Sequence, residues 1–353
     1  MIGGVPPRVA AATKHALLEL VDQAVAEGFT MQRACRVLQV TERRVRRWQA
    51  RRVARALQDR SAGGGAVHGL LDEEVEQILE LAEEWGEVDR SHRKLAHRGS
   101  RLGRVWVSPA SVYRVLAAHD LVLPKPPTRA PIQRTPWPDW LEYRPNQVWG
   151  WDVTHFGRCR APNAFAIIDL VSRKWLATLL SAEETSTQVE VVFGDALGAE
   201  GLLELVAARQ DGRVDLARDD PTRPLLLAVS DNGPQMTSGS TREFLALCSI
   251  VQHFGRPHTP TDQAPIESFF GHVKGEWPHL ERIRDPDELR AELEVVRAHY
   301  NTVRLHAGIG YVTPDDEHSG RGVQIRRARR QGLVWARRRR IAYHRKHGKE
   351  TRP

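Results

Sequence analysis

The chain has 353 residues, enough for two or three small domains, and no apolar stretch long enough to span a membrane. Its 52 lysines and arginines outnumber its 44 aspartates and glutamates, which gives a formal net charge of +8. The cysteines, Cys35, Cys159 and Cys248, are odd in number and far apart, so they support neither a disulfide framework nor a zinc motif. These features exclude a membrane-spanning protein and a disulfide-rich secreted one, and predict reduced thiols in the cytoplasm.

Positive charge is concentrated in two separated regions, Arg43–Arg55 and Arg321–Arg352, whereas Asp72–Glu87 is acidic. Two separated basic regions favour a polyanion such as DNA as the partner. Each region taken alone also fits an ordinary solvated basic surface.

Residues 1–60 have the pattern of a helix-turn-helix domain. Apolar residues recur at helical spacing over Lys14–Glu27, and Gly28 can end that helix. Thr30 can cap a second helix and Thr41 an arginine-rich third one. An ordinary basic helical hairpin is the alternative. The third helix supplies candidates for DNA contact: Arg43, Arg44, Arg46 and Arg47.

A second helical region covers residues 67–123. Asp72 can cap its first helix, and Ser108 followed by proline is a typical helix start. The region fits a second helix-turn-helix with Tyr113 and Arg114 on its recognition helix. A purely structural three-helix module fits almost as well.

Proline is dense over residues 124–145, which excludes regular helix and predicts a semi-rigid basic linker. Residues 146–317 then read as three strands, a helix, a strand, a helix, a strand and two helices. That order predicts a compact α/β core. Residues 318–353 form a basic C-terminal tail, which we expect to add sequence-independent, salt-sensitive affinity for DNA.

Three acidic residues stand in distinctive positions within the predicted core. Asp152 lies in the strand-like segment V-W-G-W-D-V-T-H-F, and Asp231 directly follows the apolar run Leu225–Ser230. Glu267 begins a helix-like run. Ligands of open α/β sheets bind at the carboxyl ends of strands. Carboxylates suit Mg²⁺ or Mn²⁺, and three of them can hold two ions that act on one phosphate.

The helix that begins near Glu267 has two distinguishable faces. Phe269, Val273 and Trp277 are spaced by four residues and are expected to pack inward. Glu267 shares another stripe with Gly271 and with Lys274, which can bind a phosphate near the metal. A solvated face is the alternative for this stripe.

Together these segments resemble the transposases of bacterial insertion sequences that share the retroviral-integrase catalytic core, of the OrfB type. The resemblance covers roughly residues 30–317. Its signs are the A-C-R-V-L helix-turn-helix, S-P-A-S-V-Y-R-V-L and Y-N-T-V-R-L-H-A-G-I-G-Y-V-T-P. It places the family's metal-binding triad on Asp152, Asp231 and Glu267 and its basic residue on Lys274. Asn232 and Thr154 are further candidates for DNA contact.

The resemblance implies an α/β RNase H-like core, a mixed five-stranded sheet with flanking helices, preceded by all-α helix-turn-helix modules. It also implies two Mg²⁺ or Mn²⁺ ions and a homo-oligomer acting on terminal inverted repeats and target DNA. A partner from an upstream reading frame, or a fusion to it, is a further implication. We expect no membrane partner, and a cytoplasmic, nucleoid-associated location.

The predicted function is that of a DDE-type transposase, which cleaves phosphodiesters at element ends and transfers the freed 3′-OH into target DNA. Two alternatives stay open. One is a catalytically inactive or domesticated DNA-binding regulator. The other is a structure-selective nuclease on the same RNase H-like fold.

Overall fold

The computed structural model describes two compact units, residues 1–69 and 70–353, and each is described here by itself. Within them it leaves out residues 1–4, 7–8, 55–56, 60–65, 124–137, 139, 217–218, 232, 255–259 and 348–353, and the side chains of 260–267. Most of the predicted linker therefore lies outside the described residues. No helix in the described part of the chain is both long and apolar enough to cross a bilayer.

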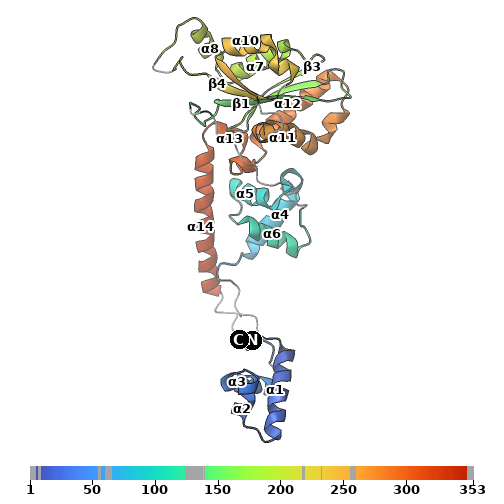
Figure 1. Cartoon of the computed structure of the whole chain (residues 1–353), viewed down its shortest axis with the longest axis vertical. Coiled ribbons are helices and arrows are strands. Elements are labelled where there is room, and N and C mark those ends of the chain that lie inside the picture. Colours follow the sequence, from blue (N-terminus) through green and yellow to red (C-terminus); the bar gives the residue numbers. More distant parts are fainter. Residues whose placement is uncertain are drawn as a thin grey trace. The chain divides into compact units, whose positions relative to one another are not determined.

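The first unit is a three-helix domain of α1 (Ala11–Ala26), α2 (Met31–Val37) and α3 (Glu42–Val53) (Figure 1). Thr30 caps α2 as predicted, since its hydroxyl accepts a hydrogen bond from the Arg33 N–H at 3.3 Å. Thr41 occupies the N-cap position of α3, but its side chain makes no capping hydrogen bond. The helices close around a small core of buried residues: Leu18, Val21, Cys35, Val40, Val45 and Trp48.

The second unit begins with a helical module formed by α4 (Asp72–Asp89), α5 (His92–Arg101) and α6 (Pro109–Ala118). The prediction that Asp72 caps α4 is wrong, because Asp72 is its first helical residue. The carboxylate of Glu74 instead accepts the Leu71 N–H at 3.0 Å. Ser108 caps α6 as predicted, accepting the Ser111 N–H at 3.1 Å.

A five-stranded mixed sheet follows, with the strand order β3-β2-β1-β4-β5. β1 pairs antiparallel with β2, and β2 with β3, whereas β1 and β4 are parallel, as are β4 and β5. The predicted fold class, an RNase H-like core with a mixed sheet and flanking helices, is confirmed. The strands are β1 (Val148–His155), β2 (Asn163–Asp169), β3 (Trp175–Ser181), β4 (Leu226–Ser230) and β5 (Ile250–Phe254).

Helices cover both faces of this sheet (Figure 1). Trp149 and Trp151 of β1 are buried on one face against α7 (Ser186–Ala199), and α8, α9 and α10 complete that side. Val148 lies on the other face, which α11 and α12 cover. The remaining bounds are α8 (Leu203–Gln210), α9 (Pro234–Thr237), α10 (Gly239–Leu247), α11 (Pro260–Glu276) and α12 (Pro286–Thr302).

The C-terminal region is more ordered than a basic tail. After the short helix α13 (Pro314–His318) the chain forms one long helix, α14 (Gly322–His347) (Figure 1). Neither α14 nor α8 is among the helices predicted from the sequence. The apolar pattern of α14 is weak, because arginines occupy much of both its inner and its outer side.

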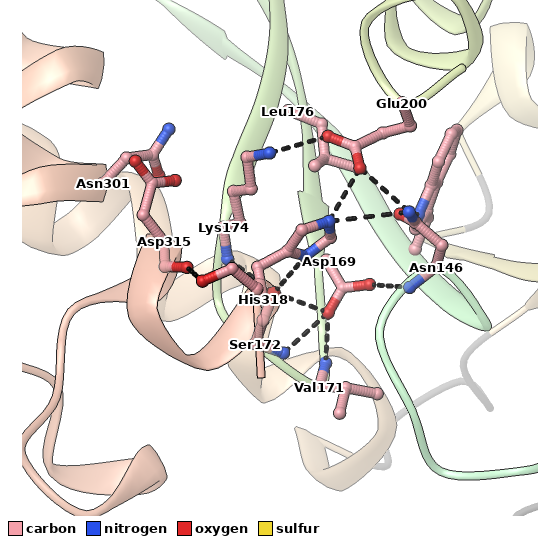
Figure 2. Close-up of polar contacts among 12 residues, drawn as sticks. Asn146, Asp169, Val171, Ser172, Lys174, Leu176, Glu200, Asn301, Asp315 and His318 are labelled. Atoms are coloured by element: carbon pink, nitrogen blue, oxygen red, sulfur yellow. Dashed lines mark hydrogen bonds and ion pairs between the residues drawn. The ribbon is translucent and has the colours of Figure 1, made fainter. Parts of the chain in front are cut away.

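A buried polar network joins α13 to the base of the sheet (Figure 2). Asp169, at the end of β2, accepts hydrogen bonds from the Asn146 N–H at 2.6 Å and from the Ser172 hydroxyl at 2.9 Å. His318 bridges the two ends of the network, with Nδ1 2.9 Å from Ser172 Oγ and Nε2 2.7 Å from Glu200 Oε2. The network thereby fixes α13, and with it the start of α14, against the core.

Glu200, which belongs to this network, makes a pH-dependent contribution to the stability of the fold. Burial raises its pKa, but hydrogen bonds from His318, Asn146 and Lys174 outweigh burial and lower the pKa from 4.5 to about 2. The unfolded chain therefore takes up this proton first as the pH falls. Stability contributed by Glu200 is complete above pH 4.5 and is lost between pH 4.5 and about 2.

We expect Glu200→Gln to flatten the dependence of stability on acidity. Between pH 6 and pH 3, the urea midpoint should fall less in this variant than in the wild-type chain, because one proton-linked group is gone. Glu243→Gln, at an exposed glutamate of α10, is the matched control and should follow the wild type. Parallel curves for Glu200→Gln and the wild type would contradict the assignment.

Candidate active site at the ends of β1 and β4

The parallel pairing of β1 with β4 brings two of the predicted acids together. The observed register pairs Val148 with Leu227 and Gly150 with Val229. Continued by two residues, the same register sets Asp152 opposite Asp231. Adjacent strands lie about 4.8 Å apart, so the backbones that carry the two aspartates are neighbours at the carboxyl end of β4.

Both aspartates belong to the sheet face that α11 covers. Side chains alternate along a strand, and Val148 and Val229 are buried in the cluster that contains Phe269 and Val273 of α11. Asp152 shares the face of Val148, and Asp231 continues that of Val229. Because α11 also carries Glu267, the fold brings the elements of all three acids to one edge of one face.

The two described carboxylates are suited to hold a divalent cation. Asp231 is exposed, and its Oδ1 accepts the Gly233 N–H at 2.9 Å. Asp152 is half-buried, and its Oδ1 accepts the Val153 N–H at 2.8 Å. Such hydrogen bonds orient a carboxylate and leave lone pairs for a metal. Carboxylate oxygens are hard donors, which Mg²⁺ and Mn²⁺ prefer as ligands.

The third acid can be placed by its backbone only. Glu267 lies within α11, but its side chain is outside the described residues, as is Asn232 altogether. Among the side chains that the structure describes, no three histidines, cysteines, aspartates or glutamates are close enough to bind an ion. The triad therefore stays a prediction.

α11 packs on the sheet through the residues expected from its sequence. Phe269 and Val273 are buried, and Trp277 is half-buried against the same cluster. Lys274 is more constrained than the sequence indicates. Its Nζ donates to the His155 carbonyl at 2.7 Å and lies 2.9 Å from Glu281 Oε1. Lys274 is thus held at the carboxyl end of β1 by contacts within the protein.

The signature Y-N-T-V-R-L-H contains residues that hold α11 and α12 in place, a role that the sequence alone did not reveal. Arg304 is buried and forms two hydrogen bonds with Glu276 at the end of α11, at 2.7 and 2.6 Å. Asn301 bridges β3, accepting the Trp175 N–H and donating to the Trp175 carbonyl, both at 2.9 Å. Burial raises the pKa of Glu276, but the Arg304 hydrogen bonds lower it, so the pair is ionised.

The helical module is fastened to the core through α5. Arg98 forms a buried two-bond ion pair with Asp89, both at 3.0 Å, and donates to the Val303 carbonyl at 2.9 Å. His97 stacks on Tyr311 with ring centroids 4.3 Å apart. Polar residues of α5 thus make contacts within the protein, with residues on either side of Arg304.

The predicted DNA-contact residues are placed differently in the two helical regions. On α6, Tyr113 is 37% exposed and meets His92 edge-on, and Arg114 is exposed with its Nε 3.2 Å from the Ala110 carbonyl. Thr154 is half-buried on the face of Asp152. Tyr113 and Arg114 are therefore accessible to solvent, and Thr154 is partly accessible.

On α3 the four arginines divide into two groups. Arg43, Arg46 and Arg47 are exposed along the outer side of the helix. Arg44 instead lies 4.6 Å from the Trp48 ring and donates to the Val5 carbonyl at 2.9 Å. Its guanidinium therefore stabilises the N-terminal segment, so the outer three are the better candidates for phosphate contact.

Comparisons with known proteins identify the type of core. A family model described as an integrase core domain matches residues 142–260, and a second of the same description matches residues 249–314. The chain carries an integrase-type core. It is also 26% identical over 174 residues to the transposase for insertion sequence element IS904 of Lactococcus lactis subsp. lactis (strain IL1403), over 49% of this chain and 61% of that protein. The resemblance to insertion-sequence transposases with an integrase-type core is confirmed.

Solved structures of integrase domains are also similar to this chain. The catalytic core domain of BIV integrase covers 51% of the chain and 97% of its own length at 19% identity, with a TM-score of 0.35. The HTLV-2 integrase catalytic core domain in complex with magnesium covers 50% and 97% at 17% identity, with a TM-score of 0.33.

We expect Arg304→Ala to destabilise the integrase-type core by about 3 kcal/mol, because it leaves the carboxylate of Glu276 half-buried without its partner. Arg290→Ala is the control, since it removes an arginine from an exposed pair with Asp287 and should cost less than about 1 kcal/mol. Urea unfolding at neutral pH measures both. Equal effects of the two substitutions would contradict the anchoring role of Arg304.

Proposed function

We propose that the chain is a DNA transposase whose catalytic residues are Asp152, Asp231 and Glu267. The observation that carries the proposal is the β1–β4 register, which pairs Gly150 with Val229. Continued by two residues, it would bring Asp152 opposite Asp231 on the sheet face that α11, the helix of Glu267, covers. Three carboxylates brought together at this strand end would repel one another unless a cation were present. This arrangement favours metal-dependent chemistry on phosphate over a purely structural role.

The three carboxylates would hold Mg²⁺ or Mn²⁺. Three acids provide enough negative charge and oxygen ligands for two such ions. Bound there, the ions supply activation of the attacking oxygen and stabilisation of the leaving one. The Gly233 and Val153 N–H groups fix the aspartate rotamers, which keeps this geometry in place before DNA arrives.

The proposed reaction has two steps at one site. Water attacks a phosphodiester at the element end, and the bond to the 3′ oxygen breaks, leaving a 3′-OH. That hydroxyl then attacks a target phosphate in line, so that one phosphodiester forms as another breaks. No covalent protein intermediate is needed. Lys274, once parted from Glu281, would neutralise charge on the phosphate, with Asn232 and Thr154 beside the metal ligands.

The helical parts are proposed to read DNA around this centre. Residues 1–60 would act as a helix-turn-helix domain through Arg43, Arg46 and Arg47, and residues 67–123 through Tyr113 and Arg114. Residues 124–145 would join these to the core at 146–317. Double-stranded element ends and target DNA are the proposed partners, bound by a homo-oligomer. The chain matches 61% of the length of the IS904 transposase. A partner from an upstream reading frame, or a fusion to it, is part of the same proposal.

The decisive experiment replaces Asp231 with Asn and measures Mg²⁺-dependent joining of labelled element-end DNA to a target plasmid. The change keeps the size of the side chain but removes its charge. We expect joining to fall more than about 100-fold, beyond the loss typical of a group that only supports a metal ligand. Asp287→Asn, at an exposed acid of α12, should leave joining unchanged.

The same assay separates the alternatives. Undiminished joining by Asp231→Asn would refute the site. Cleavage by the wild-type chain without any joined product would indicate a nuclease, because a nuclease uses water alone. Binding of end DNA without cleavage in Mg²⁺ or Mn²⁺ would indicate a regulator.

A further inference from the structure

α14 carries an inner and an outer set of arginines, and the inner set is used within the protein. Arg340 is buried, with its Nε 2.7 Å from Glu74 Oε2 and its Nη2 donating to the Trp106 carbonyl at 2.7 Å. Arg329 donates to the Gly310 and Tyr311 carbonyls, each at 2.8 Å. Arg326 pairs with Glu317 at 2.6 Å. This side of α14 is therefore fixed to the helical module and to the segment after α12.

The helix approaches the module closely enough to require a glycine. A Cβ atom placed on Gly332 would overlap the Trp106 ring, so no other residue fits at that position unless the ring moves. Ala336, one turn later, is fully buried. Small residues thus set the rotation of α14, which decides the side of the helix that faces solvent.

The solvent side of α14 forms a basic outer face, with Arg330 and Arg337 on its flank. Its five arginines are exposed and make no hydrogen bond or ion pair with any described residue: Arg327, Arg330, Arg337, Arg338 and Arg345. Arg327, Arg338 and Arg345 lie along its centre, about three and two helical turns apart. They span about 27 Å at 1.5 Å per residue.

This face differs from an ordinary solvated helix surface in its lack of counter-charges. The sequence of α14 contains no aspartate or glutamate. Like charges one turn apart, such as Arg327 and Arg330, destabilise a helix slightly, and nothing on α14 offsets that cost. On α12, by contrast, the exposed Arg290 pairs with Asp287 and the half-buried Arg297 pairs with Glu294. An outer face of this kind is stabilised when a polyanion covers it.

We propose that the basic outer face of α14 binds the phosphate backbone of double-stranded DNA independently of sequence. This rests on the proposed function in taking DNA as the substrate, and extends it by assigning a surface outside the catalytic centre. A rigid row of arginines without counter-charges suits the dense negative charge of a stiff DNA duplex better than it suits a flexible acidic peptide. Because the inner arginines lock α14, the face is preformed and its arginines lose little backbone entropy on binding.

The test compares two triple variants with equal loss of charge. Arg327→Gln with Arg338→Gln and Arg345→Gln removes the centre of the basic outer face, and glutamine retains helix propensity. The control is Arg213→Gln with Arg223→Gln and Arg290→Gln, three exposed arginines that have acidic partners. Both are made on the full chain carrying Asp231→Asn. Binding of a fluorescent 30-base-pair duplex of arbitrary sequence is measured by anisotropy in EDTA at several salt concentrations.

We expect the outer-face variant to lose at least about tenfold in affinity and two to three units in the slope of log K against log salt, since each phosphate contact contributes about 0.9. The control should keep a slope close to that of the parent chain. The experiment measures binding alone, without metal and without cleavage. Its result can therefore be interpreted even if the strand-transfer proposal is wrong.

Two outcomes would overturn the proposal. One is an unchanged slope in the outer-face variant whose circular dichroism shows α14 still folded. The other is displacement of the duplex by polyglutamate as efficiently as by unlabelled duplex, which would indicate an acidic protein as the partner of the basic outer face.

Discussion

The parallel pairing of β1 with β4 is the constraint on which the candidate site depends. Asp152 and Asp231 are far apart in the chain, and neither has a strong local reason to bind a metal. The register that pairs Gly150 with Val229 sets them opposite one another, on the face where α11 packs. A shift of one residue would turn one aspartate to the opposite face, toward α7. The buried residues on both sides of each strand make such a shift costly, so the core protects the site.

Buried arginines are the second organising feature of this protein. Arg304 ties α11 to the segment after α12, Arg98 ties α5 to the same segment, and Arg340 ties α14 to α4. Each is paired with a carboxylate, which a buried guanidinium requires. Ionic contacts thus join helices whose apolar faces are already used by the sheet or by their own module. The helical module and the integrase-type core are linked by these contacts rather than by a large shared apolar core.

Much of the fold could be predicted because its signals are local. The strands β1 to β5 and the helices α7, α10 and α12 follow from apolar runs and alternation over a few residues. The capping of α6 by Ser108 follows from hydrogen bonding within one turn. The errors have physical reasons as well. Asp72 resembles a helix cap, but Glu74 reaches back to the Leu71 N–H instead. α14 was missed as a helix because partners distant in the sequence, not an apolar stripe, neutralise its inner arginines.

The sequence by itself determined the type of core and the uneven distribution of positive charge, and it singled out the three acids as candidates. Composition, strand patterns and short motifs are properties of neighbouring residues. Only the tertiary structure decided that the strands leading to Asp152 and Asp231 pair side by side, since register depends on packing between distant strands. It likewise separated the arginines that hold the protein together, such as Arg44, Arg98 and Arg340, from those left in solvent. An arginine pairs with whichever acceptor the fold brings within reach, and no local sequence pattern specifies that acceptor.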